Sequence, residues 1–521
     1  MEYFTIEWLK HTSIRIVLLN LFVWGTSCAG APSHSAGAHS KTQTNEVATV
    51  VVERGNGLPP LSVQQHHEEP IAYRGLNGRV RNPIITHMFT ADPSARVFDD
   101  RIYVYASHDL DAQDEYEMTD YHVFSSNDLV NWQDHGVALD VADIPWADRL
   151  FAPDATYCSK TQKYYLYFPN GGDSIGVAVS DTPYGPFRDA LGKPLIERST
   201  PGVEDVEWVF DPACFVDDDG QAYLYFGGGM PGTGENARVI RLKEDMISLA
   251  DESAATIHAP DFFEASFMHK KNDTYYFSYS TTFAAHPPTI DYLISQNPLH
   301  GFVHAGTLLP NPMQNQNNNN HHSVVQYHGQ WYVFYHNRVL SEKYGYSEFQ
   351  RSITLDKIEY DSSGNMKRVN AQPGSVRQLR SLNAYTRLEA ESFADQRGIS
   401  VTPVIQNDRR TGMAVSDIHT GDWIGYSQVD FGSGATRVQM AVAGDASDGF
   451  EIEVYADGCD RFIELQGRRL GACIGSGNTQ PMQWSNLSCA LEPISGVHDI
   501  YLRFKGAAKE SRMRMDYFQF E

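Results

Sequence analysis

Alternating apolar and polar positions form five related segments between residues 80 and 375. Each segment has an apolar strand interrupted by one polar residue, a turn of Asp, Lys, Gly or Asn, and then a tyrosine-rich strand. Paired strands that recur every 50 to 60 residues or so predict a β-propeller, and five repeats predict five blades. The interrupting residues, at intervals of 62, 57, 53 and 57, are Asp92, Asp154, Asp211, Glu264 and His321.

The first strand of each pair is expected to line the central channel of the propeller, so equivalent positions would face one axial pocket. Asp92, Asp211 and Glu264 would then meet there, although they are far apart in the chain. Phe262 and Phe263 precede Glu264, and burial raises a carboxyl pKa because a low-dielectric environment penalises the charged form. A glutamic acid that keeps its proton near neutral pH is a candidate general acid.

The pattern changes near residue 384, where short alternating strands such as "DWIGYSQVDFG", "FEIEVYAD" and "HDIYLRFKG" begin. Their spacing predicts a β-sandwich of jelly-roll type. We therefore predict an all-β chain, with a five-bladed β-propeller at 81–375 followed by a β-sandwich module at 384–521.

The N-terminus has the features of a secretory signal. Lys10 and Arg15 precede the apolar run "IVLLNLFVWG", which is too short to span a bilayer, and "AGA" at 29–31 offers a cleavage site. We predict a signal peptide at 1–31, a weakly ordered leader at 32–80, and a secreted or periplasmic mature protein without a transmembrane span. Cys28 in "GTSC" leaves a lipid anchor as the alternative, although Gly25 stands where a larger aliphatic residue is usual.

Composition limits the partners of the protein. A net charge of −24 over 521 residues argues against nucleic acid. The 28 Tyr, 26 Phe and 8 Trp suit a β-rich core and also suit stacking against sugar rings. We expect a monomer without an organic cofactor.

Five cysteines remain after the signal segment, and an odd number excludes complete pairing within one chain. Three of them, Cys459, Cys473 and Cys489, cluster near the C-terminus. In an oxidising compartment we predict one disulfide among these three.

The propeller segments resemble glycoside hydrolase family 43, the five-bladed inverting arabinofuranosidases and xylosidases. The matching motifs, in chain order, are "TADPS", "FAPD", "FDPA", "FFEAS", "NHHS" and "FYHNR". The related sucrose and fructan hydrolases carry N-D-P-N where this chain has "ADPS", so we set that family aside.

The resemblance implies that Asp92 is the general base, that Glu264 is the general acid, and that Asp211 orients and tunes the acid. The chemistry of the residues agrees. An inverting glycosidase needs two carboxyl groups about 6.5–9.5 Å apart, so that a water fits between one of them and the sugar. A charged Asp211 would help Glu264 to keep its proton, since a like charge disfavours ionisation.

Four further residues are candidates for substrate binding. Phe151 stands where the family often has tryptophan, and Arg338 could bind sugar hydroxyls. Asp154 follows a proline in a predicted turn at the pocket rim, where binding to backbone is an equal alternative. Family members often hold calcium on the propeller axis through a histidine at the position of His321, but calcium prefers oxygen ligands, so a structural or substrate-binding role is an alternative.

The C-terminal part resembles a family 6 carbohydrate-binding module, through "LEAES", "GDWIGY", "GVHDIYLRF" and "DYFQFE". The resemblance implies a structural calcium held by Glu389, Glu391 and Asp516.

The sugar cleft of such modules is poorly matched. Val415 and Ser416 occupy the place of the first aromatic residue, and Arg514 replaces an asparagine. In "TQPMQW", Pro481 and Met482 surround the second aromatic position, and only Trp484, expected to be buried, is kept. A module with little affinity for sugar through this cleft, or a purely structural one, is therefore expected.

Together these features predict an inverting glycoside hydrolase that removes α-L-arabinofuranosyl or β-D-xylosyl residues from plant cell-wall polysaccharides such as arabinoxylan. The alternatives are a glycosidase acting on galactose-containing chains and a non-catalytic carbohydrate-binding propeller. The presence of all three acids argues against the second alternative.

Overall fold

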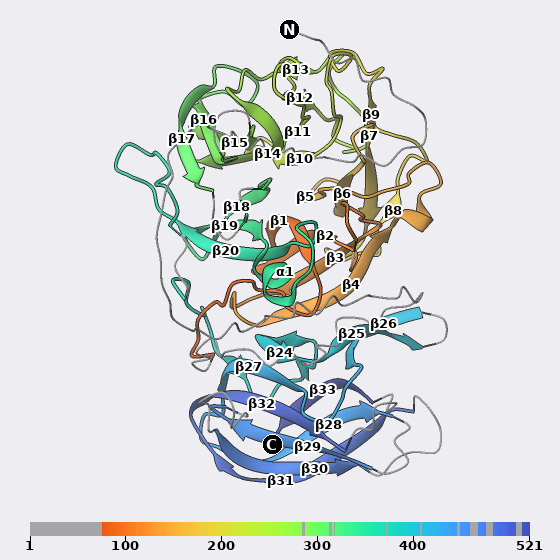
Figure 1. The fold of residues 1–521 in the computed structure, drawn as a ribbon, viewed down its shortest axis with the longest axis vertical. Coiled ribbons are helices and arrows are strands. Elements are labelled where there is room, and N and C mark those ends of the chain that lie inside the picture. Colours follow the sequence, from red (N-terminus) through yellow and green to blue (C-terminus); the bar gives the residue numbers. More distant parts are fainter. Residues whose placement is uncertain are drawn as a thin grey trace, which may run out of the picture. The chain divides into compact units, whose positions relative to one another are not determined.

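Five β-sheets surround a common centre in the computed structural model of the chain (Figure 1). The structure describes residues 76–521 apart from 112, 284–286, 312–314, 317, 371–373, 407–408, 445–448, 459–466, 476–482 and 507–512. The predicted signal segment and Cys28 lie outside the described residues. Within the described residues, no helix is both long and apolar enough to cross a membrane.

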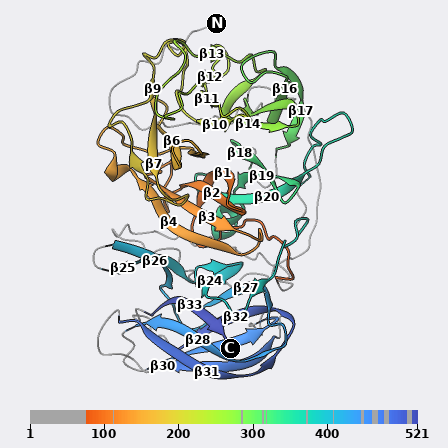
Figure 2. The same ribbon diagram turned by 180° about the vertical axis from the view of Figure 1, so that it is seen from behind.

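The strands of each blade follow one another in chain order from the centre outwards, as Figures 1 and 2 show from opposite sides. The first blade contains β1 (Thr90–Phe98), β2 (Arg101–His108), β3 (Asp120–Ser126) and β4 (Trp132–Asp140). The second contains β5 (Asp154–Cys158), β6 (Lys163–Asn170), β7 (Ser174–Ser180) and β8 (Arg188–Asp189), with β9 (Ile196–Glu197) also paired to β7. The third contains β10 (Ala213–Val216), β11 (Ala222–Phe226), β12 (Arg238–Arg241) and β13 (Ala255–Thr256).

The fourth blade contains β14 (Phe262–Lys271), β15 (Thr274–Thr281), β16 (Ile290–Ser295) and β17 (Val303–Leu309). The fifth contains β18 (His322–Tyr327), β19 (Gln330–Asn337) and β20 (Ser352–Ile358). A 3-10 turn, η1 (Val141–Asp143), follows β4, and the helix α1 (Val339–Tyr344) follows β19. The first strand of each blade contacts the first strand of the next around the ring, β1, β5, β10, β14, β18 and back to β1, so the prediction of a propeller with innermost first strands is confirmed.

The blades are buried on both faces, and β2 shows why. Successive side chains of a strand point to opposite faces. Ile102, Val104 and Ala106 pack into one apolar core, whereas Tyr103 and Tyr105 pack into another on the other side of the sheet. The tyrosine-rich strands of the sequence are therefore the second strands of the blades, held between two neighbours.

The C-terminal part is a β-sandwich, as predicted. One sheet has the order β21 (Leu382–Asn383), β27 (Trp423–Asp430), β32 (Val497–Lys505), β29 (Phe450–Ala456) and β30 (Arg468–Gly475), with β24 (Asp395–Arg397) beside β27. The other has the order β25 (Ser400–Gln406), β26 (Arg409–Ser416), β33 (Arg514–Phe520), β28 (Ala435–Ala443) and β31 (Ser485–Ile494), with β22 (Leu388–Glu389) beside β33. The short β23 (Ser392–Phe393) pairs with β4.

The predicted C-terminal disulfide is present and joins Cys473 on β30 to Cys489 on β31, so it links the two sheets of the sandwich. Cys459 lies outside the described residues. Cys158 and Cys214 are buried free thiols within the propeller.

One predicted boundary needs correction. Residues 76–80 were assigned to the leader, but Leu76 and Val80 are buried, and Val80 packs in the same core as Ile102. The ordered structure therefore begins before residue 81.

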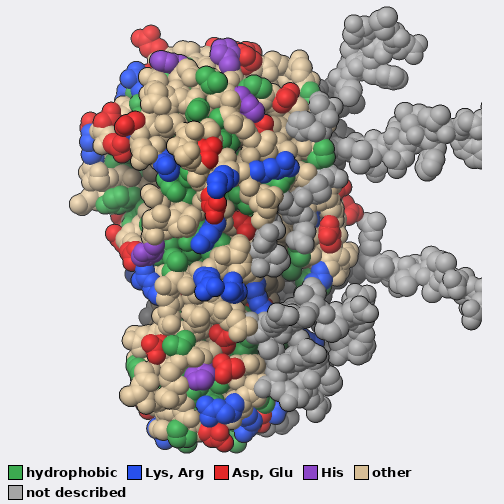
Figure 3. Space-filling view, turned by 90° about the vertical axis from the view of Figure 1, so that its left-hand side faces the viewer, with side chains coloured by type: hydrophobic (Ala, Val, Ile, Leu, Met, Phe, Trp, Pro, Cys, Tyr) green, Lys and Arg blue, Asp and Glu red, His purple; other side chains and the backbone are tan. Residues whose placement is uncertain are grey.

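On the face that Figure 3 shows, acidic and basic side chains are interspersed, so the net negative charge does not gather there into one broad patch.

Candidate active site

Three acids from different blades meet at the centre of the propeller. Asp92 lies on β1, Asp211 lies just before β10, and Glu264 lies on β14. The Nδ1 atom of His321 is 3.7 Å from Asp92 Oδ1 and 3.7 Å from Asp211 Oδ2. Asp211 Oδ2 also accepts a 2.9 Å hydrogen bond from the backbone N–H of Ala265, the residue after Glu264. The structure thus brings together the three acids that the repeat pattern singled out.

The backbone is strained where it presents these acids. Asp92, Asp211 and Ala265 have φ angles of 49°, 50° and 61°, in the left-handed region that residues other than glycine rarely occupy. The pairing register also shifts in β1 around Asp92 and in β14 around Glu264. Such bulges re-aim side chains, and strain of about 1–3 kcal/mol per residue is retained where function needs it.

Asp92 is held in its ionised form. Burial alone would raise the pKa of its carboxyl, but the Arg351 guanidinium, together with a hydrogen bond with His336, holds that pKa well below its usual range. Arg351 Nη1 donates to Asp92 Oδ1 at 2.6 Å. An ionised carboxylate that can accept a proton is what a general base requires.

Arg351 and Asp109 are site residues that sequence reasoning missed. Arg351 donates from Nε and Nη2 to the two carboxylate oxygens of Asp109, at 2.9 and 2.7 Å. Both side chains are only 2% exposed. No motif marked them. Asp109 follows His108, which is paired with Thr90 in the same blade as Asp92, whereas Arg351 lies just before β20 and reaches Asp92 only because the fifth blade closes against the first.

Glu264 and Asp211 form a coupled pair with a retained proton. Burial, followed by the charge of Asp92, raises the pKa of Glu264 to about 8. Burial and the Glu264 and Asp92 charges also raise the pKa of Asp211. The Ala265 N–H stabilises the ionised form of Asp211, so we place the proton on Glu264, as expected for a general acid.

Arg338 contacts the acid Glu264 indirectly, through Asn319. Its five N–H groups are used by Glu348 O, Asn315 Oδ1, Tyr116 Oη and two oxygens of Asn319. Asn319 in turn donates to Glu264 Oε1 at 3.3 Å. Arg338 is fully buried and has no N–H left for a sugar hydroxyl, so it positions Asn319 and does not fit the substrate-binding role predicted from the sequence.

Asp154 also has a structural role. Its oxygens accept hydrogen bonds from Ser94 Oγ, from the Arg96 guanidinium and from the backbone N–H of Cys214. These partners lie on β1 and β10, so Asp154 at the start of β5 ties three innermost strands together. The sequence placed it in a rim turn as a sugar ligand, but its carboxylate is buried and fully used, and backbone binding is the alternative that holds.

His321 lies between Asp92 and Asp211, and Phe151 is linked to these acids through Tyr121. Burial lowers the pKa of His321 to about 4, so its ring is neutral between the two aspartates. Phe151 is half-buried, and its carbonyl accepts from the hydroxyl of Tyr121, which interacts with Asp92 and Asp211. His336, which sequence reasoning also missed, lies 3.4 Å from Asp92 Oδ1 through Nδ1 and contacts Asn319 O through Nε2.

In the sandwich, Arg387 pairs with two of the three carboxylates that were expected to hold calcium. Arg387 donates to both oxygens of Glu389 and to Asp516 Oδ1. Glu391 Oε2 is buried without a hydrogen-bond partner, and burial followed by the neighbouring Glu389 and Asp516 charges raises the pKa of this carboxyl. Arg387 therefore neutralises Glu389 and Asp516, and Glu391 keeps a partner-free carboxylate oxygen of the kind that calcium prefers.

The expected sugar cleft of the sandwich has no aromatic wall among the described residues that were predicted to line it. Val415 is fully buried in the core, and Arg514 donates to Thr402 and Pro403. Trp484 is half-buried, whereas a buried side chain was expected, and Pro481 and Met482 lie outside the described residues.

Two buried carboxyl groups with opposite pKa shifts, at the centre of a five-bladed propeller, are what acid–base hydrolysis of a glycosidic bond requires. The chain belongs to the glycosyl hydrolases family 43, whose family model matches residues 80–366. The model of the carbohydrate binding module (family 6) matches residues 389–521.

Similar proteins extend over both parts of the chain. An arabinoxylan arabinofuranohydrolase of Paenibacillus polymyxa is 36% identical over 483 residues, which cover 84% of this chain and 74% of that protein. Another from Bacillus subtilis (strain 168) is 35% identical over 485 residues, covering 84% and 92%. A solved structure of a family 43 arabinoxylan arabinofuranohydrolase from Bacillus subtilis, in complex with cellotetraose, superposes with a TM-score of 0.77 at 34% identity and covers 86% of this chain and 99% of that chain.

Proposed function

We propose that this hydrolase removes α-L-arabinofuranosyl or β-D-xylosyl residues from arabinoxylan with inversion at the anomeric carbon. The observation that carries the proposal is the pairing of Asp92, whose pKa is lowered, with Glu264, whose pKa is raised, on innermost strands of the propeller. Likeness along both domains to arabinoxylan arabinofuranohydrolases supports the substrate class.

In this mechanism, Asp92 takes a proton from a water as the water oxygen bonds to the anomeric carbon. The bond from that carbon to the leaving oxygen breaks, and Glu264 gives its proton to that oxygen. Arg351 keeps Asp92 ionised, and the Asp211 charge opposes ionisation of Glu264. His321 offers calcium a nitrogen, whereas this ion prefers oxygen, so we assign its neutral ring to the pocket and not to an axial calcium.

Substrates with different leaving groups distinguish the role of Glu264 from the role of Asp92. A nitrophenolate leaves with little help from an acid, whereas a sugar hydroxyl needs a proton. Glu264→Gln should therefore lose about 10²–10⁴-fold in kcat on arabinoxylan and much less on a nitrophenyl arabinofuranoside. Asp92→Asn should lose activity on both. Asp261→Asn, an exposed turn residue just before β14, is the matched control and should keep wild-type rates.

The sugar and the stereochemistry are tested with one panel. Nitrophenyl α-L-arabinofuranoside, β-D-xyloside and β-D-galactofuranoside are compared by kcat/KM, and proton NMR of a fresh digest identifies the first anomer formed. We expect release from the first two substrates and an inverted product. Preference for the galactoside would support the alternative substrate class, and a retained anomer would exclude Asp92 as a base.

We propose further that Glu389, Glu391 and Asp516 hold a structural calcium in the sandwich. Calcium that binds only the folded state raises the melting temperature by mass action. The full-length chain is melted with chelator and with added calcium, beside Glu391→Gln. We expect a rise in the wild type that is lost in the variant, and an equal rise in both would place the calcium elsewhere.

We also propose export from the cytoplasm through residues 1–31. Expression with and without these residues, followed by cell fractionation, tests this. A Cys28→Ser variant labelled with palmitate distinguishes a lipid anchor from a cleaved signal.

A further inference from the structure

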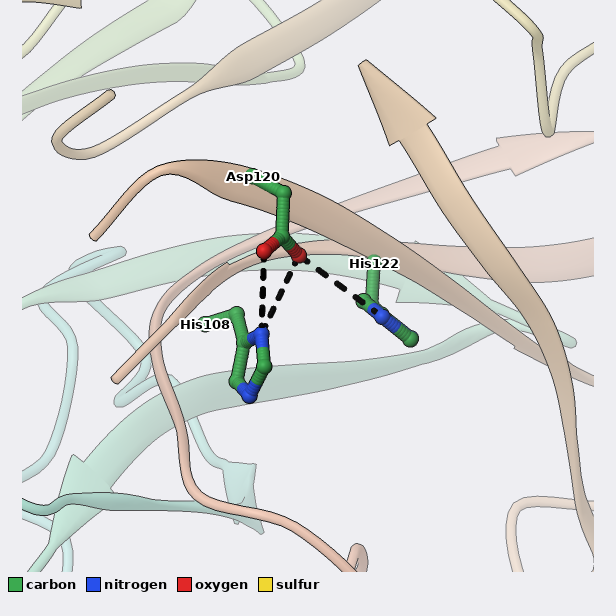
Figure 4. Close-up of side chains that lie close together, drawn as sticks. All are labelled: His108, Asp120 and His122. Atoms are coloured by element: carbon green, nitrogen blue, oxygen red, sulfur yellow. Dashed lines mark hydrogen bonds and ion pairs between the residues drawn. The ribbon is translucent and has the colours of Figure 1, made fainter. Parts of the chain in front are cut away.

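Two histidines and an aspartate cluster at one end of the first blade (Figure 4). His108 ends β2, Asp120 begins β3, and His122 follows two residues later on the same face of that strand. Ser107, just before His108, is paired with Tyr121, which lies between Asp120 and His122. The antiparallel pairing of β2 and β3 therefore brings all three side chains to one place.

The separations between these groups are those of ligands around one metal ion. His108 Nδ1 is 3.1 Å from each oxygen of Asp120, and His122 Nε2 is 3.7 Å from Asp120 Oδ1. One ligand atom from each residue lies within 4.8 Å of the other two. Zinc bonds of about 2.0–2.2 Å in a tetrahedron place neighbouring ligand atoms about 3.4 Å apart, which is between the two observed distances.

A second layer of contacts orients His122 for this role. Its Nδ1 donates to Asp134 Oδ1 at 3.2 Å. Asp134 is itself held by His87 Nε2 at 2.9 Å and by the backbone N–H of Gly136 at 2.6 Å. A proton on Nδ1 leaves the lone pair of Nε2 facing Asp120. A carboxylate behind a histidine is the usual second-layer partner of a metal-bound imidazole, because it sets the tautomer and the ring direction.

The cluster is neither sealed nor fully exposed. The side chain of His108 is 22% exposed, and those of Asp120 and His122 are 12% and 11% exposed. The cluster is therefore reached from solvent past His108. Asp120 and Asp134 supply two carboxylates, so the cluster favours a divalent cation over an anion.

We propose that His108, Asp120 and His122 bind one divalent transition-metal ion. Two imidazole nitrogens and one carboxylate oxygen suit zinc and its neighbours, whereas calcium prefers oxygen alone. The ion would replace the proton between His108 and Asp120 and would clamp the end of β2 to the start of β3. Asp109, which holds Arg351, is the next residue after His108, so the clamp would secure one wall of the catalytic pocket.

The test measures metal directly on the full-length chain. Chelator-treated protein is titrated with zinc, and bound metal is counted after gel filtration. His108→Gln and His122→Gln are compared with His304→Gln, whose histidine pairs with Asp291 at 2.8 Å in the fourth blade. Other zinc sites on the chain contribute equally to every variant, so the difference between variants is the readout.

We expect the wild type and His304→Gln to bind one more equivalent of zinc than either cluster variant, and to gain a few degrees in melting temperature that the cluster variants do not gain. Cobalt(II) in place of zinc should give a tetrahedral visible spectrum that His108→Gln lacks. If His122→Gln does not fold, His108→Gln decides, because its side chain is the more exposed. Equal zinc content and equal melting shifts in the wild type and His108→Gln would overturn the proposal.

Discussion

Replacement of Arg351 by methionine should move the acidic limb of the pH profile to higher pH. Arg351 makes three charge-assisted side-chain hydrogen bonds, one to Asp92 and two to Asp109. It is the largest influence that lowers the pKa of Asp92 against burial, and an adjacent arginine lowers an aspartate pKa by about 1–3 units. In Arg351→Met, the acidic limb of kcat/KM should therefore rise by about 1–3 pH units.

The same change should cost stability. It leaves Asp109 buried without its cation, and breaking a buried ion pair from one side costs about 3–5 kcal/mol. The backbone N–H of residue 351 still donates to Asp109 at 2.8 Å, so the lower end of that range is expected. Adding Asp109→Asn removes the stranded charge and should restore part of the stability but not the acidic limb.

The assay is kcat/KM on a nitrophenyl glycoside from pH 3 to 9 or so, together with urea unfolding. Arg238→Met is the matched control, because Arg238 is equally buried but pairs with Asp205 in the third blade, away from the acids. It should lower stability and leave the profile unchanged. A folded Arg351→Met enzyme with the wild-type acidic limb would refute the claim that Arg351 sets the protonation state of Asp92.

Three further predictions concern other parts of the chain. The alkaline limb should lie near pH 8, where Glu264 loses its proton, and Asp211→Asn should move it to lower pH by removing a like charge; an unmoved limb would contradict the coupling. Arg338→Met should lower kcat with little change in KM, since Arg338 positions Asn319; a change in KM alone would indicate a direct sugar contact. Replacing Cys473 and Cys489 by alanine opens a 16-residue separation and should cost about 3 kcal/mol by calorimetry, while nitrophenyl glycoside hydrolysis is retained.

The sequence by itself determined the architecture and the acids. The alternation in strands such as β2 requires two buried faces, and its repetition five times leaves a propeller as the arrangement that covers every face. Asp92, Asp211 and Glu264 were recognisable because a polar residue at the same place in an otherwise apolar strand recurs with the repeat. A local sequence pattern is sufficient to identify such residues when it recurs with the same period as the blades.

The tertiary structure alone decided how those acids are held. Arg351 reaches Asp92 and Asp109 only because the ring closes the fifth blade against the first, and nothing in its own neighbourhood marks it. Arg338 and Asp154 lie in motifs that suggested sugar contacts, but their hydrogen-bond partners come from segments distant in the chain. Whether a polar side chain faces a substrate or a neighbouring strand depends on which groups burial leaves unpaired, and that is determined only when the blades are packed together.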